Sequence, residues 1–339
     1  MTSPSPLPPP APNHHPLRRV LIGTSLEDES DQVVRSGLAV ARAAGAKIHL
    51  IHAAPGGPRL VGPETGQGYD FAQELTAWCE ERLRGQIERL GIGPSELAGA
   101  EILEGVPHQV LIAAAQKAAA DLIVVGATGS GPFAAELLGS TADRVLRKAT
   151  CPVLLVRGEL PVPPRRVLAA VDLSKLSGDS FRCGLHLLAQ LGTSAETEVR
   201  VVYALAFLDT LALKRREKRE ISDAEAESLS TDELRRFVLE NGAGFPLPTA
   251  TTLLCGDARS EILEELRQRP VDLVMLGTHG RGGLDRLILG SVAATLARKA
   301  PCSVLLISPE AALAEDIAEA VVDRTTPAWH LEPAPATHG

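Results

Sequence analysis

A long internal repeat is the feature that most constrains how this chain can fold. Residues 121–156 align without gaps with residues 272–307, at an offset of 151, and 16 of the 36 aligned positions are identical. Upstream, RRVLIGTSLEDES from Arg18 parallels RRVLAAVDLSKLS from Arg165 at an offset of 147, and KIHLIHAAP from Lys47 parallels EVRVVYALA from Glu198 at 151. Because 339 residues suffice for two domains that each bury a core, the repeat predicts a duplicated domain.

Each copy alternates short apolar runs with longer segments of helical periodicity. In the first copy the runs are residues 20–23, 48–52, 100–103, 122–126 and 153–156. Strand–helix alternation predicts crossover units and a parallel sheet, and near-continuous apolar runs such as DLIVV and DLVML fit strands covered on both faces. We therefore expect an α/β protein with two tandem doubly wound domains, each an open five-stranded parallel sheet of order 3-2-1-4-5 with helices on both faces.

Composition places the boundaries between these parts. Both ends of the chain are proline-rich, and GELPVPP from Gly158 is a linker stiffened by proline. We expect a disordered tail over residues 1–16, domains over 17–158 and 165–308 with a linker over 159–164, and a short helix with a disordered tail over 309–339.

Two segments differ between the copies. The first copy has a glycine and proline loop before a predicted helix at about residues 71–90. The second has a highly charged helical stretch over residues 213–242, and its basic run is residues 214–219. We interpret this run as a solvated helix face, and docking of an acidic partner is the alternative.

Charge and hydropathy exclude several classes of protein. The net charge of −8 argues against a mainly electrostatic nucleic-acid partner. No run of about 18 apolar residues predicts a membrane span, and the N-terminal segment lacks the apolar core of a secretory signal, so we expect residence in the cytoplasm. Five scattered cysteines without a CxxC pair indicate reduced, mostly buried thiols.

Matched glycines follow the fourth predicted strand of both copies. Gly277, Gly280 and Gly290-Ser291 have the same spacing as Gly126, Gly129 and Gly139-Ser140. In an open parallel sheet, ligands bind beyond the carboxyl ends of the strands, and a helix N-terminus favours phosphate. The glycines and a helix capped by Ser291 would then form a phosphate cradle. The alternative is that the glycines only make tight turns and the serine only caps a helix.

Other phosphate-binding motifs do not fit these loops. Neither loop has the lysine of GxxxxGK[ST], so neither is a Walker A loop. GSGPFA, residues 129–134, formally satisfies GxGxxG/A but follows the fourth strand rather than the first and contains Pro132. No SGGxDS-like loop follows either first strand, which weakens an ATP pyrophosphatase interpretation.

The segment GTHGRGGLDRLILGS, in a predicted five-stranded parallel α/β domain, resembles the universal stress protein family. Nucleotide-binding members of that family carry Gly-x2-Gly-x9-Gly-Ser/Thr. The likeness covers about 290 of the 339 residues and includes VDLS after the first strand and LARKAPCSVLLIS at the end. It implies a tandem universal stress protein with Rossmann-like domains. The implied ligand is ATP or another adenine nucleotide, with Mg²⁺ considered as its companion and no protein ligands assigned to the metal.

The resemblance implies a set of nucleotide-binding positions in the second half. They are Ala170, Val171, Asp172, Leu173, Ser174, Ala204, Gly277, His279, Gly280, Arg281, Gly282, Gly290, Ser291 and Val292. Asp172 would line the pocket, the backbone of Ala204 would meet adenine, and the glycine loop would surround ribose and phosphates. In the first half Ser25 stands in the place of Asp172, so the carboxylate is lost. The weaker candidates there are Ser25, Gly126, Gly129, Ser130, Gly139 and Ser140, and we expect binding chiefly in the second half.

The function we expect is that of an ATP-binding stress-response or signalling protein whose bound and free states present different surfaces to a protein partner. The alternative is a structural or interaction protein that binds no nucleotide and forms an internal pseudo-dimer, since family members pair along the fifth strand, here CPVLLV and CSVLLI. A slow ATP hydrolase is a third possibility. Because Asp172 and His279 are explained more simply as ligand contacts, we expect no enzyme. The sequence leaves open the stress, the partner and the formation of a homodimer.

Overall fold

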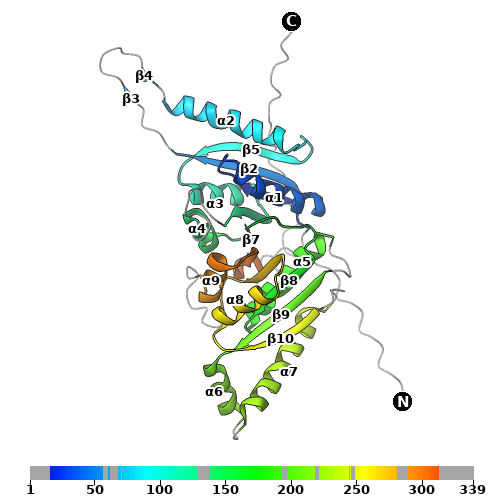
Figure 1. Cartoon of the computed structure of the whole chain (residues 1–339). Helices are drawn as coiled ribbons and strands as arrows, with labels where there is room; N and C mark the ends of the chain where they lie inside the picture. The colour runs from blue at the N-terminus through cyan, green and yellow to red at the C-terminus, as the bar shows by residue number, and fades with distance from the viewer. Residues whose placement is uncertain are drawn as a thin grey trace.

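The two copies form one continuous ten-stranded sheet (Figure 1). The computed structural model describes residues 16–55, 60–61, 68–69, 71–127, 138–192, 197–217, 221–243, 245, 249–280 and 289–312. The first half contains β1 (Arg19–Gly23), α1 (Ser30–Ala44), β2 (Lys47–Ala54), β3 (Leu60–Val61), β4 (Gly68–Tyr69), α2 (Phe71–Arg89), β5 (Leu97–Glu104), α3 (Pro107–Ala118), β6 (Leu122–Gly126), α4 (Ser140–Lys148) and β7 (Val153–Val156). The second contains β8 (Arg166–Val171), α5 (Lys175–Gln190), β9 (Glu198–Leu205), α6 (Phe207–Arg216), α7 (Asp223–Asn241), β10 (Thr249–Cys255), α8 (Ala258–Gln268), β11 (Leu273–Gly277), α9 (Ser291–Lys299) and β12 (Ser303–Ile307).

Strand order confirms the predicted topology in both halves. Across the sheet the strands run β10-β9-β8-β11-β12-β7-β6-β1-β2-β5. Within each half the order is 3-2-1-4-5 and every neighbouring pair is parallel. The small β3–β4 hairpin, which lies in the glycine and proline loop, forms a separate antiparallel pair.

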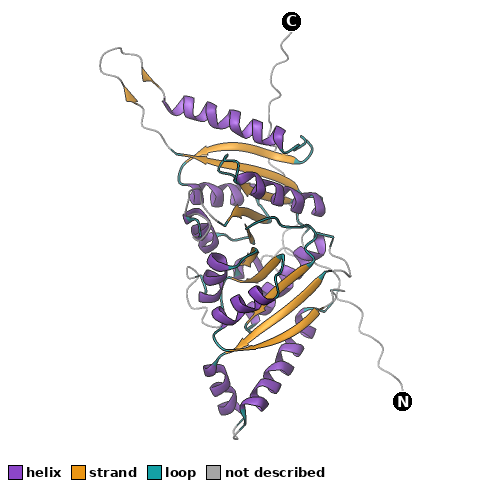
Figure 2. Ribbon diagram, in the orientation of Figure 1, coloured by secondary structure: helices purple, strands orange, loops and turns teal. Residues whose placement is uncertain are grey.

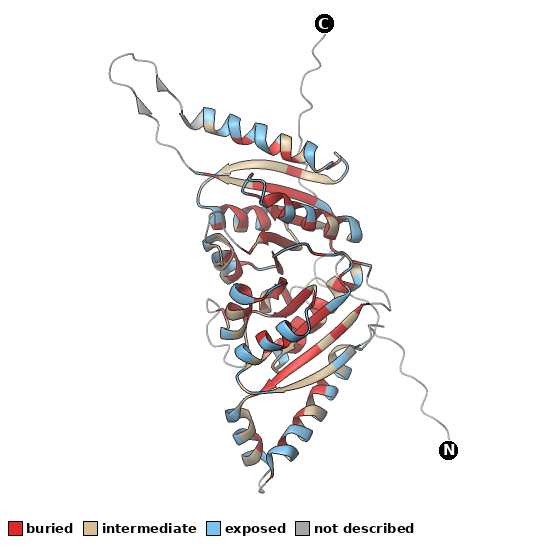
Figure 3. Ribbon diagram, viewed as in Figure 1, coloured by how far each residue is buried: buried red, intermediate tan, exposed pale blue. Residues whose placement is uncertain are grey.

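Helices cover both faces of the sheet, as the apolar strands require (Figure 2). One buried cluster joins α1, α2, α5 and α7 to one face, and a second joins α3, α4, α8 and α9 to the other. Each cluster contains residues of both halves, so on each face of the sheet the hydrophobic core runs without a break from the first half into the second. Burial is highest in the central strands and lower in the outermost strands β5 and β10 (Figure 3).

The two halves meet where β7 and β12 pair in antiparallel register. Val304, Leu305 and Leu306 lie opposite Leu155, Leu154 and Val153. All residues of both strands are buried. The expected pairing along the fifth strands is therefore present, and it occurs within a single chain.

Arg157, directly after β7, crosses this junction to the end of α9. Its guanidinium donates hydrogen bonds to the backbone carbonyls of Ala297, Arg298 and Ala300 at 3.1, 3.1 and 2.8 Å. Carbonyls in the last turn of a helix have no partner within the helix, and a positive charge there is stabilising. A residue of the first half thus caps a helix of the second.

The charged stretch of the second half forms two helices, α6 and α7, and residues 218–220 between them lie outside the described residues. Lys214 pairs with Asp223 at 2.8 Å, and Arg216 pairs with Glu233 at 2.7 Å. These ion pairs support a solvated helix face that neutralises its own charge.

Some sequence predictions concern residues that the structure only partly describes. Residues 309–312 are helical, and the remainder of the helix and tail predicted there lies outside the described residues, as does most of the N-terminal tail. Within the described part of the chain, no helix combines the length and the apolar character needed to cross a membrane.

Replacement of Arg157 tests the junction between the halves. We expect Arg157→Ala to lower the free energy of unfolding by about 2 kcal/mol, because it removes charge-assisted hydrogen bonds from the end of α9. Urea unfolding measures this. Arg147→Ala is the control, since Arg147 only pairs with Asp143 one turn away on α4, and we expect it to cost under about 0.5 kcal/mol. Equal effects of the two variants would contradict the role given to Arg157.

The buried thiol of Cys302, directly before β12, makes the free energy of unfolding depend on pH. Burial raises the pKa of its thiol to about 12, whereas the pKa of a cysteine thiol in an unfolded chain is about 8.5. The unfolded state therefore loses this proton first, and stability falls as the pH rises above about 8.5, by up to about 1.4 kcal/mol per pH unit. In urea unfolding, Cys302→Ala should give a shallower fall between about pH 8.5 and 10.5 than the wild type does. Cys255→Ala, at an exposed thiol, should change the slope less, and the reverse order would refute the assignment.

Candidate functional site

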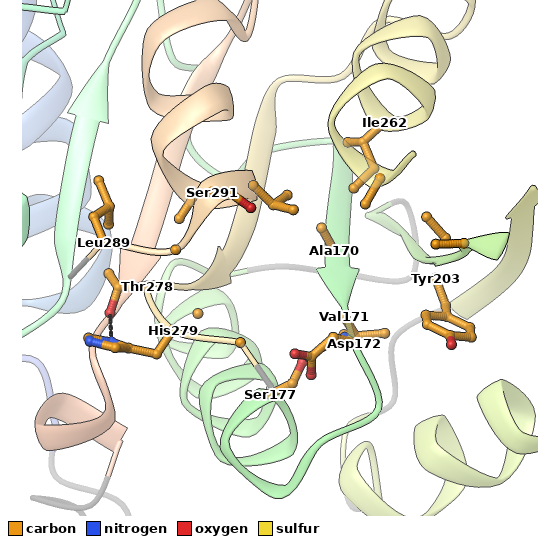
Figure 4. Close-up of a pocket in the computed structure, with 18 of the residues that line it drawn as sticks. Ala170, Val171, Asp172, Ser177, Tyr203, Ile262, Thr278, His279, Leu289 and Ser291 are labelled. Atoms are coloured by element: carbon orange, nitrogen blue, oxygen red, sulfur yellow. Dashed lines mark hydrogen bonds between the residues drawn. The ribbon is translucent and has the colours of Figure 1, made fainter. Parts of the chain in front are cut away.

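A cavity of about 630 Å³ opens at the carboxyl edge of the second half (Figure 4). Its walls come from the ends of β8, β9 and β11 and from the first turns of α6, α8 and α9. β9 pairs with one side of β8 and β11 pairs with the other side. The strands that follow β8 are therefore added first in one direction across the sheet and then in the opposite direction, and the reversal occurs at β8. The cavity therefore lies at the topological switch point, where open α/β sheets bind their ligands.

Most of the sequence-predicted residues of the second half meet in this cavity. The lining residues among them are Ala170, Val171, Asp172, Ala204, Gly277, His279, Gly280, Gly290, Ser291 and Val292. Leu173 and Ser174 are not among the lining residues, and Arg281 and Gly282 lie outside the described residues.

Leu173 and Ser174 have structural positions beside the site. Leu173 packs against the core, and its left-handed backbone, with φ of 63°, turns the chain from β8 into α5. Ser174 is the N-cap of α5, and its hydroxyl accepts a hydrogen bond from the N–H of Ser177 at 3.2 Å. This turn positions Asp172, because Asp172 Oδ1 accepts a hydrogen bond from the Ser174 N–H at 3.0 Å.

The glycine loop after β11 comes very close to its neighbours. A Cβ on Gly280 would lie 3.0 Å from Asp172 Oδ2, and one on Gly290 would lie 3.0 Å from the Thr278 carbonyl oxygen. The Gly290 N–H donates to that same oxygen at 2.7 Å, and the Thr278 N–H donates to Ile307 O at 2.9 Å. Hydrogen bonds thus hold the two ends of the loop together. Glycine is needed at position 280, where the backbone lies against Asp172, and at position 290, where it lies against the backbone of Thr278.

The N-terminus of α9 presents to the cavity backbone donors that have no acceptor within the helix. Gly290 is the N-cap and Ser291 is the first helical residue, so the prediction that Ser291 caps this helix is wrong. Ala294 is the first residue whose N–H bonds back to Gly290 O. The N–H groups of Ser291, Val292 and Ala293 precede it in the first turn, and all three residues line the cavity.

The imidazole of His279 is turned toward Thr278 rather than toward Asp172 (Figure 4). Its Nδ1 lies 2.9 Å from the Thr278 hydroxyl oxygen, and its Nε2 is buried without a hydrogen-bond partner in the structure. Thr278 therefore holds the ring at one side of the glycine loop.

Sequence analysis missed about half of the lining. The additional residues are Ser177, Tyr203, Ala206, Asp209, Ala258, Ile262, Thr278, Leu289 and Ala293. Strand–helix alternation contained a signal for part of this set, because every helix that follows a parallel strand begins at the same edge of the sheet. Ala258 and Ile262 are one turn apart at the start of α8 and form an apolar wall. Asp209 lies in the first turn of α6 and accepts a hydrogen bond from the Ala206 N–H at 3.3 Å.

Charge in the cavity has two opposing sources. The described part of the lining contains two carboxylates, Asp172 and Asp209, and no lysine or arginine. The first turns of α6, α8 and α9 point their partial positive charge at the same space. An anionic group is therefore favoured at the α9 end, away from the carboxylates.

The first half keeps the turns of this site without its carboxylate. Leu26 has the same left-handed φ of 63° as Leu173, and exposed Ser25 precedes it. Gly126 ends β6, Ser140 begins α4, and the Gly139 N–H donates to Ala127 O at 2.9 Å, as Gly290 does to Thr278. Gly129 and Ser130 lie outside the described residues.

Comparison with known proteins gives matches over both halves. The model described as "Universal stress protein family" matches residues 16–157 and 164–308. A universal stress protein of Methanocaldococcus jannaschii is 30% identical over 140 residues, which cover 41% of this chain and 82% of that protein. One of Mycobacterium tuberculosis is 28% identical over 200 residues, covering 55% of this chain and 61% of its own length.

A solved structure supports the arrangement of the whole sheet. The crystal structure of a universal stress protein from Archaeoglobus fulgidus matches with a TM-score of 0.61 and 18% identity, and the match covers 87% of this chain and 98% of that one. At this identity the likeness concerns the fold alone.

The two serines at the helix starts predict different effects on stability. Ser174→Ala removes the cap of α5 and should lower the free energy of unfolding by about 1 kcal/mol. Ser291→Ala removes a hydroxyl from the first helical residue of α9, where Gly290 is the cap, and should change it by less than about 0.5 kcal/mol. Chemical denaturation of both variants checks this, and a larger loss at Ser291 would restore it as a cap.

Proposed function

The chain belongs to the universal stress protein family, with one family domain in each half, and we propose that it is a stress-response or signalling protein that binds ATP chiefly in its second half. The observation that carries the proposal is the cavity at the switch point. It combines the first turn of α9, two glycines at which a Cβ would lie only 3.0 Å from a neighbouring oxygen, and a facing carboxylate. Its volume of about 630 Å³ falls in the usual range for pockets that hold small organic ligands.

The phosphates of a nucleotide would lie at the α9 end of the cavity. Free N–H groups at a helix N-terminus and in a glycine loop bind phosphate oxygens, and each charge-assisted hydrogen bond contributes on the order of 1.5 to 3 kcal/mol. Because residues 280 and 290 are glycines, no Cβ crowds Asp172 or the Thr278 carbonyl at this end. Arg281, which follows directly in the sequence, would add positive charge to the phosphates.

The base and the ribose would lie toward β8, β9 and α8. Ala204 and Ile262 provide apolar surface there, and the edge of adenine would meet the backbone at the end of β9. The Asp172 carboxylate, held by the Ser174 N–H, is an acceptor suited to ribose hydroxyls. These contacts favour a nucleotide over inorganic phosphate.

Magnesium would enter with the phosphates rather than occupy a site of its own. Among the described residues, no group of three or more histidines, cysteines or acidic residues is arranged to hold a metal ion. ATP would thus bring Mg²⁺ on its own oxygens. We propose binding without rapid turnover, because Asp172 and His279 both have positions explained by structural contacts.

Nucleotide titration with matched glycine variants tests which half binds. Calorimetry of the purified chain should give one ATP per chain. Gly280→Val should weaken binding at least tenfold, or about 1.4 kcal/mol, because its side chain would press on Asp172 and fill the phosphate cradle. Gly129→Val, the matched position of the first half, should change affinity less than twofold. Thermal unfolding of both variants serves as the control for folding.

Several outcomes would overturn the proposal. Two equal sites, or loss of binding in Gly129→Val but not in Gly280→Val, would reject the second half as the main site. No adenine nucleotide in mass spectra of ligand released from the protein, together with no binding in calorimetry, would favour the structural alternative. Steady ATP turnover at about 1 per second, abolished by Asp172→Asn, would favour a hydrolase.

A further inference from the structure

A second hollow, of about 280 Å³, lies in the first half between α3 and the strands β2 and β5. It is separate from the proposed nucleotide site, which lies in the other half. Its floor is apolar, formed by Ile51, Leu103, Val110, Ala114 and Ala118. The lining is completed by Ala113 and by four polar residues, namely His49, Glu101, Glu104 and Lys117. The volume lies just below the range of about 300 to 1,000 Å³ that is usual for pockets that hold organic ligands.

His49 is a buried polar side chain without a partner at this hollow. It is 7% exposed and makes no hydrogen bond with any described residue. Its neighbour on β5 is Gly99, where a Cβ would lie 3.3 Å from His49 Nδ1 and 3.6 Å from Glu101 Oε1. The imidazole and the Glu101 carboxylate are therefore adjacent, and the glycine leaves them room.

Two acceptors thus face the same space. Burial lowers the pKa of His49, so the ring is neutral and one of its nitrogens can accept a hydrogen bond. A ligand that donates to His49 and Glu101 would supply hydrogen bonds that these two side chains do not make with other described residues.

The second half shows what fills the corresponding space when the chain supplies it. At the offset of 151, His49 corresponds to Arg200 and Ala114 corresponds to Glu265. The Arg200 guanidinium donates to Glu265 at 3.2 Å and to Glu198 at 3.0 Å. In the second copy, therefore, a cation on a hydrocarbon stem lies over the sheet between β9 and α8.

The first half has His49 in place of this arginine, and its carboxylates stand at different positions, because Lys47 and Ala114 replace Glu198 and Glu265 of the second half. Glu101 and Glu104 replace Thr252 and Cys255 of the second half. The lining has two carboxylates and the ammonium of Lys117, and the guanidinium of Arg19 lies beside it, where it donates a hydrogen bond to the Ala118 carbonyl. The Glu101 carboxylate beside the neutral His49 ring, together with the apolar floor, favours a cationic donor with a short hydrocarbon body.

We propose that this hollow binds a small organic cation of the alkylguanidinium or alkylammonium class. The cationic head donates to Glu101 and His49, and the hydrocarbon stem lies on Ile51 and Leu103. The ligand takes the place that the Arg200 side chain occupies in the second copy.

Isosteric probes test the proposal on the full chain. n-Butylguanidinium and the neutral n-butylurea have similar shapes, and the methyl NMR signals of Ile51 and Val110 report on the hollow. We expect saturable binding of n-butylguanidinium at one site per chain and at least tenfold weaker binding of n-butylurea. Glu101→Gln should weaken n-butylguanidinium at least tenfold, whereas Glu88→Gln, an exposed position on α2, should leave it unchanged.

The double variant His49→Arg with Ala114→Glu rebuilds the ion pair of the second half and should abolish binding of the probe. ATP titration of the same variants should match the wild type, which separates this site from the proposed nucleotide site. Equal affinity for the two probes, equal binding by Glu101→Gln and the wild type, or absence of saturable shifts at Ile51 and Val110 would overturn the proposal.

Discussion

The antiparallel pairing of β7 with β12 is the interaction on which the rest of the structure depends. Without it, each half would expose its fifth strand, an apolar edge with unpaired backbone groups of the kind that aggregates. Pairing buries both edges at the centre of one sheet and makes the two cores continuous. Because β7 and β12 run in opposite directions, the carboxyl ends of the first half's strands and those of the second half's strands lie at opposite edges of the ten-stranded sheet. One ligand therefore cannot bridge the two potential sites, and each site could diverge independently.

Divergence has been concentrated in side chains, while the turns have been retained. Leu26 and Leu173 share a left-handed backbone, and Gly105 and Gly256 share φ values of 144° and 142° after the third main strand. These backbone conformations belong to the fold and are needed in both copies. The exchange of Asp172 for Ser25, by contrast, leaves the turn intact and changes only what the edge of the sheet can bind.

The sequence was sufficient to predict the strands and the duplicated domain, because these depend on apolar periodicity and on a repeat that is visible in the letters, whereas the pairing of the halves was predicted only through the resemblance to the family. The site was predicted only where it lies on the glycine motif and the strand ends. The wall formed by Ala258 and Ile262 depends on how α8 packs over the sheet, which no local pattern shows. Ser174 and Ser291 illustrate the remaining difficulty. Both are serines at helix starts, but a difference of one position in the helix boundary makes one a cap and the other a lining residue.

The half without the carboxylate contacts a helix that lines the cavity of the other half. Helix α9 has only nine residues, so its two ends are about 13 Å apart. Its first turn lines the cavity, and its last carbonyls accept hydrogen bonds from Arg157 of the first half. A helix this short depends on tertiary contacts for its stability. The order of its N-terminal donors is therefore linked to the junction between the halves, and this gives the duplication a physical role that does not require two equal binding sites.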